Sequence, residues 1–165
     1  MNIERQTSNA QHRILYSDIR FIGVGNEYRQ DDGVGLFIAR HLGLLHLPGA
    51  RTTETQRDAT RLMDLWIGAE IVFVFDAVFS GAASGAVYRL DAVNKPLADD
   101  LFQLSTHRLG IVEAVELSRT LNQLPAELVL YGIEGLNFGQ GQGLSLPCKR
   151  SALNVIRRVL VELGI

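Results

Sequence analysis

The sequence has very little cysteine, which excludes a disulfide-stabilised fold. Cys148 is the only cysteine among 165 residues, and one thiol cannot form an internal disulfide. No apolar run approaches the roughly 20 residues of a transmembrane helix, and residues 1–17 are polar, without the apolar segment of a secretory signal. We therefore predict a cytoplasmic protein, with a flexible N-terminal tail at 1–17 and a single domain at 18–165.

An excess of charge of one sign is also missing. The chain carries 16 basic and 18 acidic residues, giving a net charge of −2. This balance lacks the basic footprint of a nucleic-acid-binding protein and the polybasic stretch that binds an anionic membrane. We expect neither nucleic acid nor a membrane as a partner. Because nothing in the composition demands a second copy, we expect a monomer.

Short apolar strands alternate with amphipathic helices along the chain. Strands are predicted at 19–25, 50–55, 71–75, 86–90 and 128–133. Helices are predicted at about 34–45, 59–66, 111–121 and 152–163, where apolar residues recur at helical spacing. The unbroken apolar run at 71–75 is typical of a central parallel strand covered on both faces. The pattern predicts a single-domain three-layer α/β sandwich: a twisted, mostly parallel sheet with helices on both faces.

Three polar residues follow the predicted strands or precede a helix. Asp32 follows the first strand, Asp76 ends the central strand, and His107 lies just before a helix. Ligands of open α/β sheets bind beyond the carboxyl ends of the strands. Two carboxylates and an imidazole suit a divalent transition metal, with positions left for water or substrate. The simpler alternatives are that each aspartate caps a helix or turn and that the histidine is not a ligand.

Two other motifs carry weaker predictions. Cys148 lies near a predicted helix start, where a thiolate is favoured, but no glycine elbow or histidine adjoins it. Gly23-Val24-Gly25 after a strand is similar to a dinucleotide-binding turn. Tyr28 stands where the third glycine is expected, however, and the carboxylates of Asp31 and Asp32 repel a pyrophosphate. The nucleotide-binding α/β protein is therefore the less favoured alternative.

Four sequence blocks occur in a distinctive order. They are Gly23–Gly35, which contains Asp-Asp-Gly-Val-Gly, then Asp76–Gly81 (Asp-Ala-Val-Phe-Ser-Gly), Ser105–Gly110 (Ser-Thr-His-Arg-Leu-Gly) and Tyr131–Gly135 (Tyr-Gly-Ile-Glu-Gly). Each block alone is a weak signal, but the ordered set resembles the hydrogenase maturation proteases. These endopeptidases process the large subunit of nickel–iron hydrogenases. The chain departs from the residues common in the family at four positions, Glu27, Gln30, Phe79 and Arg108. None of these is one of the three polar residues named above.

The resemblance gives the three polar residues a role. It implies that Asp32, Asp76 and His107 are the metal ligands and the catalytic site. It further implies that nickel arrives inside the partner, a [NiFe] hydrogenase large-subunit precursor, whose short C-terminal extension is then removed. We expect that cadmium or zinc can also occupy the site in vitro.

Two questions stay open from the sequence. Hydrolysis can use a metal-activated water or an aspartate as general base, with Asp31 as a spare carboxylate that otherwise caps a helix. Glu134 is a further acidic candidate, interpreted mainly as structural or as contacting a partner. The competing function class is a non-catalytic, metal-dependent hydrogenase assembly factor.

Overall fold

The computed structural model describes residues 18–95, 97 and 109–165. The predicted tail at 1–17 and the predicted ligand His107 lie outside the described residues. The strands are β1 (Ile19–Val24), β2 (Ala50–Thr55), β3 (Ile71–Val78), β4 (Val87–Asp91) and β5 (Glu127–Glu134). The helices are the 3-10 turn η1 (Gln30–Gly33), α2 (Val34–Gly43), α3 (Ala59–Trp66), α4 (Leu109–Thr120) and α5 (Leu146–Leu163).

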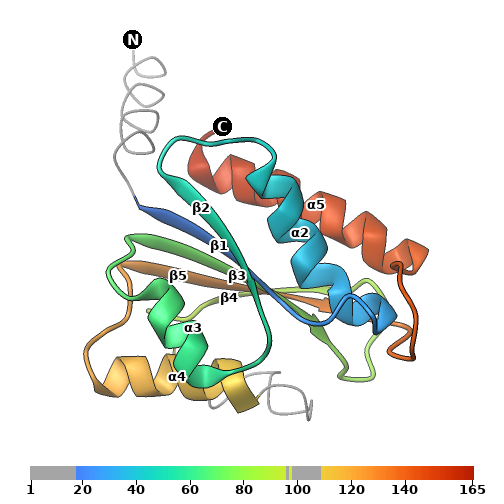
Figure 1. Ribbon diagram of the computed structural model, residues 1–165, viewed down its shortest axis with the longest axis horizontal. Helices are drawn as coiled ribbons and strands as arrows, with labels where there is room; N and C mark the ends of the chain where they lie inside the picture. Colours follow the sequence, from blue (N-terminus) through green and yellow to red (C-terminus); the bar gives the residue numbers. More distant parts are fainter. Residues whose placement is uncertain (1–17, 96, 98–108) are drawn as a thin grey trace.

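The strands form one twisted sheet in the order β2-β1-β3-β5-β4. Four strands pair in parallel, and β4 joins β5 antiparallel at one edge. Helices α2 and α5 cover one face of the sheet, and α3 and α4 cover the other (Figure 1). The predicted three-layer α/β sandwich is confirmed. Within the described residues, no helix combines the length and the apolar character needed to cross a bilayer.

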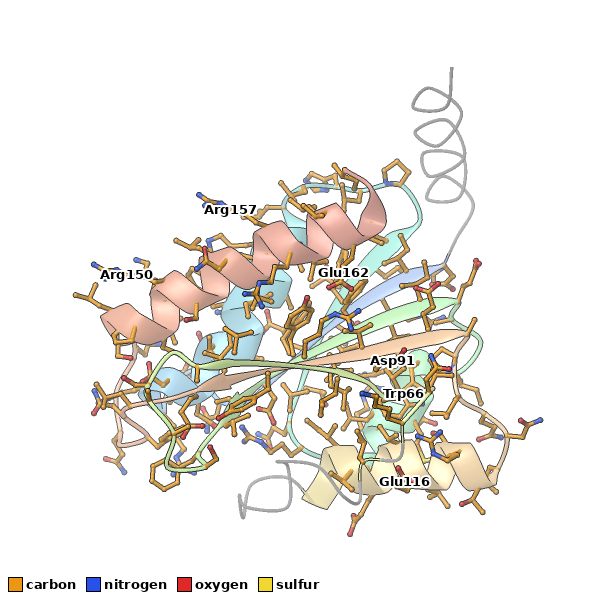
Figure 2. All side chains as sticks on the ribbon, turned by 180° about the vertical axis from the view of Figure 1, so that it is seen from behind. Trp66, Asp91, Glu116, Arg150, Arg157 and Glu162 are labelled. Atoms are coloured by element: carbon orange, nitrogen blue, oxygen red, sulfur yellow. The ribbon has the colours of Figure 1, made fainter. Side chains whose placement is uncertain are left out.

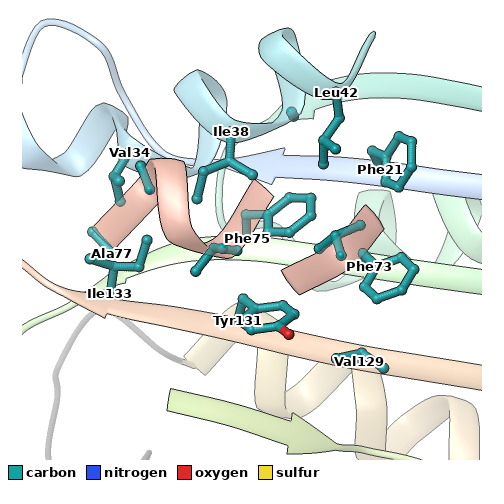
Figure 3. Close-up of a cluster of buried hydrophobic side chains, with 14 of the residues drawn as sticks. Phe21, Val34, Ile38, Leu42, Phe73, Phe75, Ala77, Val129, Tyr131 and Ile133 are labelled. Atoms are coloured by element: carbon teal, nitrogen blue, oxygen red, sulfur yellow. The ribbon is translucent and has the colours of Figure 1, made fainter. Parts of the chain in front are cut away.

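Each face of the sheet carries its own apolar core. Beneath α2 and α5, an aromatic row crosses β3 and β5, with ring centroids 6.5 Å apart for Phe73 and Phe75 and 6.2 Å apart for Phe75 and Tyr131 (Figure 3). On the opposite face Trp66 of α3 is fully buried, and its indole N–H donates to the hydroxyl of Ser118 on α4 at 3.1 Å (Figure 2). Every residue of β3 is buried, which confirms the prediction of a central strand from its apolar run.

One of two predicted helix starts differs from the structure. Helix α2 has Gly33 at its N-cap position, so neither Asp31 nor Asp32 caps it, and the predicted carboxylate cap is wrong. Helix α5 begins at Leu146, which confirms the predicted helix start near Cys148, ahead of the apolar face at 152–163. Pro147 lies in its first turn. Proline suits that place because the first turn of a helix does not use its N–H groups.

Candidate functional site

Asp32 and Asp76 meet at the carboxyl edge of the sheet, with Arg57 between them. Asp32 comes from η1, which follows β1, and Asp76 comes from the neighbouring strand β3. Arg57 precedes Asp58, the N-cap of α3. Its Nη2 atom donates to Oδ1 of Asp32 and to Oδ1 of Asp76, both at 2.6 Å. The structure therefore brings together two of the three predicted site residues around a cation that the sequence analysis missed.

The turn after β1 holds Asp32 over the end of the sheet. Gly25 has a φ of +143°, and a Cβ there would lie 1.9 Å from the carbonyl oxygen of Asp32. That carbonyl accepts the N–H of Asn26 at 3.2 Å, while the N–H of Gly25 donates to Thr55 of β2 at 3.1 Å. The turn thus folds back on protein backbone where a dinucleotide-binding turn would leave room for a pyrophosphate, which removes support from the nucleotide alternative.

Asp76 lies inside β3 rather than at its end. The strand continues to Val78, so the predicted position of Asp76 at the end of the strand is wrong by two residues. Side chains alternate along a strand, and Val72 and Val74 belong to the core beneath α3 and α4. Asp76 therefore faces the same side as Arg57, whose Nε also donates to Oδ2 of Asp76 at 3.0 Å.

This cluster buries one positive and two negative charges. The side chains of Arg57, Asp32 and Asp76 are 16%, 3% and 7% exposed. Burial raises the pKa of Asp76 to about 7; the ion pair with Arg57 opposes this shift, and the charge of Asp32 adds to it. Burial lowers the pKa of Arg57, but the two carboxylates outweigh it and the net shift is upward. Two buried carboxylates require a cation between them to stay ionised.

A polar cavity opens beside the cluster. It encloses about 370 Å³ and is lined by Gly25, Asn26, Arg29, Asp32 and Arg57, among others. Among the described residues, no three His, Cys, Asp or Glu side chains are placed to hold a metal ion. Helix α4 starts two residues after His107, and Gly110 packs so closely that a Cβ there would lie 2.6 Å from the carbonyl of Arg57. Two predicted ligands are thus assembled, and the role of His107 stays a prediction.

Asp31 has a task separate from that of its neighbour Asp32. Its carboxylate is fully buried and accepts the N–H groups of Leu136, Asn137 and Ser145 at 2.8, 3.0 and 2.7 Å, together with the Ser145 hydroxyl at 2.8 Å. Burial raises the pKa of Asp31, but these hydrogen bonds outweigh it and lower the pKa overall. Asp31 therefore anchors the segment between β5 and α5, and its predicted roles as a helix cap or spare base are wrong.

Two further predicted candidates are structural. Glu134 is buried and accepts the N–H groups of Ser80 and Gly81 at 2.7 and 3.1 Å and the Ser80 hydroxyl at 2.8 Å. It thereby ties the loop after β3 to β5, as its structural interpretation predicted. Cys148 is buried, and burial together with the charge of Asp31 raises the pKa of its thiol. A reactive thiolate at this position is therefore contradicted.

Comparison with protein families places this fold and cluster in context. A family model described as hydrogenase maturation protease matches residues 57–162, which is more than half of the chain. The chain belongs to the hydrogenase maturation protease family. The matched span begins at Arg57 and includes Asp76 and His107, whereas Asp32 precedes it. This confirms the family identified from the ordered sequence blocks.

Individual relatives support the same placement. The hydrogenase expression/formation protein HupD of Thiocapsa roseopersicina is 26% identical over 133 residues, and the match covers 79% of this chain but 60% of that protein. The hydrogenase maturating endopeptidase HybD of E. coli has a similar fold, with a TM-score of 0.75, 22% identity and coverage of 88% of this chain and 91% of that one. The [NiFe] hydrogenase maturation protease HybD of Thermococcus kodakarensis gives a TM-score of 0.67 at 23% identity, over 89% and 99%.

Proposed function

We propose that the protein is an endopeptidase that removes the C-terminal extension of a nickel-loaded [NiFe] hydrogenase large-subunit precursor. One observation carries the proposal beyond family membership. Two buried carboxylates, from segments far apart in the sequence, converge on a single cation at the carboxyl edge of the sheet. A site that already holds one cation between two carboxylates offers the donor atoms that a divalent transition metal requires.

In this proposal the nickel belongs to the substrate. Asp32, Asp76 and His107 bind the nickel of the precursor and so report that the precursor is loaded. Cleavage consumes one water: the scissile C–N bond breaks, the large subunit gains a new C-terminal carboxylate, and the extension leaves with a new amino terminus. Nickel, or cadmium or zinc in vitro, is the metal that we expect at the site.

The structure excludes Asp31 as the general base that activates the attacking water. All of the hydrogen bonds that anchor Asp31 use its two carboxylate oxygens, and the residue has no exposed surface. It cannot approach a water in the neighbouring cavity as a general base. The proposal therefore keeps two routes, polarisation of the scissile carbonyl and water by the metal, or proton removal by Asp32 or Asp76.

The proposal is tested with purified nickel-loaded precursor. We expect His107→Ala and Asp76→Asn to remain folded and to leave the precursor at its full mass in mass spectrometry, whereas the wild type shortens it. His41→Ala is the matched control, because His41 is an exposed residue on α2 whose ring centroid lies 4.0 Å from that of Phe37, at a tilt of 34°. This control should process the precursor normally. Normal processing by His107→Ala would contradict the assigned role.

The same experiment distinguishes the proposed endopeptidase from the alternative, a non-catalytic assembly factor. A non-catalytic assembly factor would bind the precursor, and the mass of the precursor would not change with the wild-type protein. The expected cytoplasmic location and monomeric state stay predictions.

A further inference from the structure

The guanidinium of Arg57 occupies the oxygens that a metal would use. Its Nη2 atom donates to Asp32 Oδ1 and Asp76 Oδ1 at 2.6 Å each, and its Nε donates to Asp76 Oδ2 at 3.0 Å. A weaker contact of 3.5 Å joins Nη1 to Oδ2 of Asp32. All four carboxylate oxygens therefore contact one guanidinium. The Oδ1 atoms of Asp32 and Asp76 both accept from Nη2 of Arg57. A divalent ion bound by these two oxygens would therefore have to take the place of that nitrogen.

The charge balance supports an exchange between the two cations. When both carboxylates are ionised, Arg57 with Asp32 and Asp76 leaves one net negative charge in a cluster that is almost fully buried. A divalent ion in the same position would neutralise both carboxylates, which a guanidinium with its single charge does not achieve. Removing the guanidinium with no replacement would instead leave two buried carboxylates facing each other, which is unfavourable.

The neighbouring cavity gives the displaced side chain a place to go. The cavity of about 370 Å³ adjoins Arg57 and is lined by Asn26, Gln56 and Asp58, which offer polar partners to a guanidinium. The backbone of Arg57 can stay where Gly110 of α4 packs against it. Only the long, rotatable side chain has to move, which is a small rearrangement.

We propose that Arg57 is a built-in competitor for the metal: it closes the site in the free protein, and a divalent metal binds only by displacing it. The metal's identity as the precursor's nickel rests on the proposed function, whereas the competition itself does not. Loose divalent ions then bind the free protein weakly. Selectivity for a metal presented within a substrate follows, because contacts with the rest of the substrate help to displace the arginine.

The test measures metal affinity with the metal alone. Cd²⁺ and Ni²⁺ are titrated by calorimetry into the full-length wild type, Arg57→Gln and the matched control Arg89→Gln, which removes an arginine–carboxylate pair with Glu162 away from the site. We expect the Kd of Arg57→Gln to be lower than that of the wild type by about tenfold or more, as loss of a charged, hydrogen-bonded competitor implies. Arg89→Gln should match the wild type.

An unchanged or higher Kd in Arg57→Gln would overturn the inference, since a merely structural arginine would weaken metal binding when removed. If that variant does not fold, Arg57→Lys answers the same question. Lysine keeps the charge but lacks the planar fork, so its Kd should fall between those expected for the wild type and for the glutamine variant. An unchanged or higher value would again be contrary. The titration contains no precursor, so its result does not depend on the processing assay. If the wild type failed to cut the precursor in that separate assay, the proposed function would be contradicted, but the competition between Arg57 and the metal would still stand.

Discussion

At the scale of single residues, the buried acidic side chains are distinguished by their partners. Asp31, Asp32, Asp76 and Glu134 are all buried. Asp32 and Asp76 share the guanidinium of Arg57, whereas Asp31 and Glu134 accept hydrogen bonds from backbone N–H groups and serine hydroxyls. Burying a carboxylate is favourable only when such partners are present. The two acids that share the guanidinium are therefore candidate metal ligands, because a metal could replace that cation. The two acids that bind backbone N–H groups instead anchor loops.

The anchoring role of Asp31 predicts a loss of stability in Asp31→Asn. The amide nitrogen of asparagine would face N–H donors, so at least one of the four hydrogen bonds would be replaced by a buried donor–donor contact. We expect a decrease of about 2–4 kcal/mol in the free energy of unfolding in urea, with faster amide exchange over residues 136–145. Asp91→Asn, at the partly exposed end of β4 where Asp91 accepts the N–H groups of Val93 and Asn94, should cost about 1 kcal/mol or less. A change within about 0.5 kcal/mol in Asp31→Asn would contradict the role.

The sequence could not assign the neighbours Asp31 and Asp32 to their different tasks. Both precede the same helix, and either has the chemistry of an N-cap. Their tasks depend on Ser145 and Arg57, which are remote in sequence and belong to no periodic pattern. Arg57 itself had one local signal: it is a cation two residues after a predicted strand whose carboxyl end reaches the same edge of the sheet as Asp76. That signal is weak because most such arginines are simply solvated.

At the scale of elements, the close packing of α2 against the sheet positions the site. A Cβ on Gly35 would lie 2.2 Å from the carbonyl oxygen of Phe75 on β3 and 2.5 Å from that of Val24 on β1. Both neighbours are backbone atoms, which cannot move aside as a side chain can. The first turn of α2 therefore packs directly on β1 and β3. This packing holds η1, which carries Asp32, above the carboxyl ends of these two strands.

Gly35→Ala is therefore predicted to disrupt the fold. The added methyl group has to push α2 away from β1 and β3, and we expect a destabilisation of about 3 kcal/mol or more, or failure to fold. Gly139→Ala is the matched control, because a Cβ there would meet its nearest described neighbour, Nε2 of Gln30, at 4.0 Å. Thermal and urea unfolding of both variants measure the difference. Equal stabilities for the two variants would show that α2 tolerates displacement.

The elements themselves were largely predictable, but their ends were not. The apolar runs at 71–75 and 128–133 identify β3 and β5 because fully buried strands need no polar alternation. Asp76 interrupts the first run, yet β3 continues, since pairing with β5 extends from Asp76 opposite Gly132 to Val78 opposite Glu134. Pairing with a remote strand decides where a strand ends, and a local pattern does not contain that information.

At the scale of the whole molecule, α5 is tied to the sheet by a polar group at its C-terminal end. Glu162 of α5 lies on the side of the helix that faces the sheet (Figure 2). Arg89 of β4 donates to its two carboxylate oxygens at 2.9 and 2.8 Å, and the hydroxyl of Tyr131 on β5 donates to it as well. Burial and the neighbouring Glu162 raise the pKa of Tyr131 to about 12, so the phenol remains a donor across the physiological range. One ionised carboxylate therefore joins the outer helical layer to two strands.

This arrangement predicts how stability depends on pH. Burial opposes ionisation of Glu162, but hydrogen bonds from Arg89 and Tyr131 outweigh it, so the folded-state pKa of Glu162 is lowered. A lowered pKa contributes stability that is complete above the unfolded value of about 4.3 and is lost as the pH falls through the folded value. We expect the wild type to exceed Glu162→Gln by about 1 kcal/mol at pH 7, a modest value because the pair is partly solvated.

The decisive measurement is the difference between these two proteins in urea unfolding at pH 7, 5, 4 and 3. Other carboxylates with lowered pKa values, such as Asp18 and Asp91, destabilise both proteins equally as the solution is acidified, so they cancel in the difference. The difference should shrink below about pH 4.3 as Glu162 takes up a proton in the unfolded and then in the folded state. A difference that stays constant from pH 7 to pH 3 would mean that the charge of Glu162 does not hold α5 on the sheet.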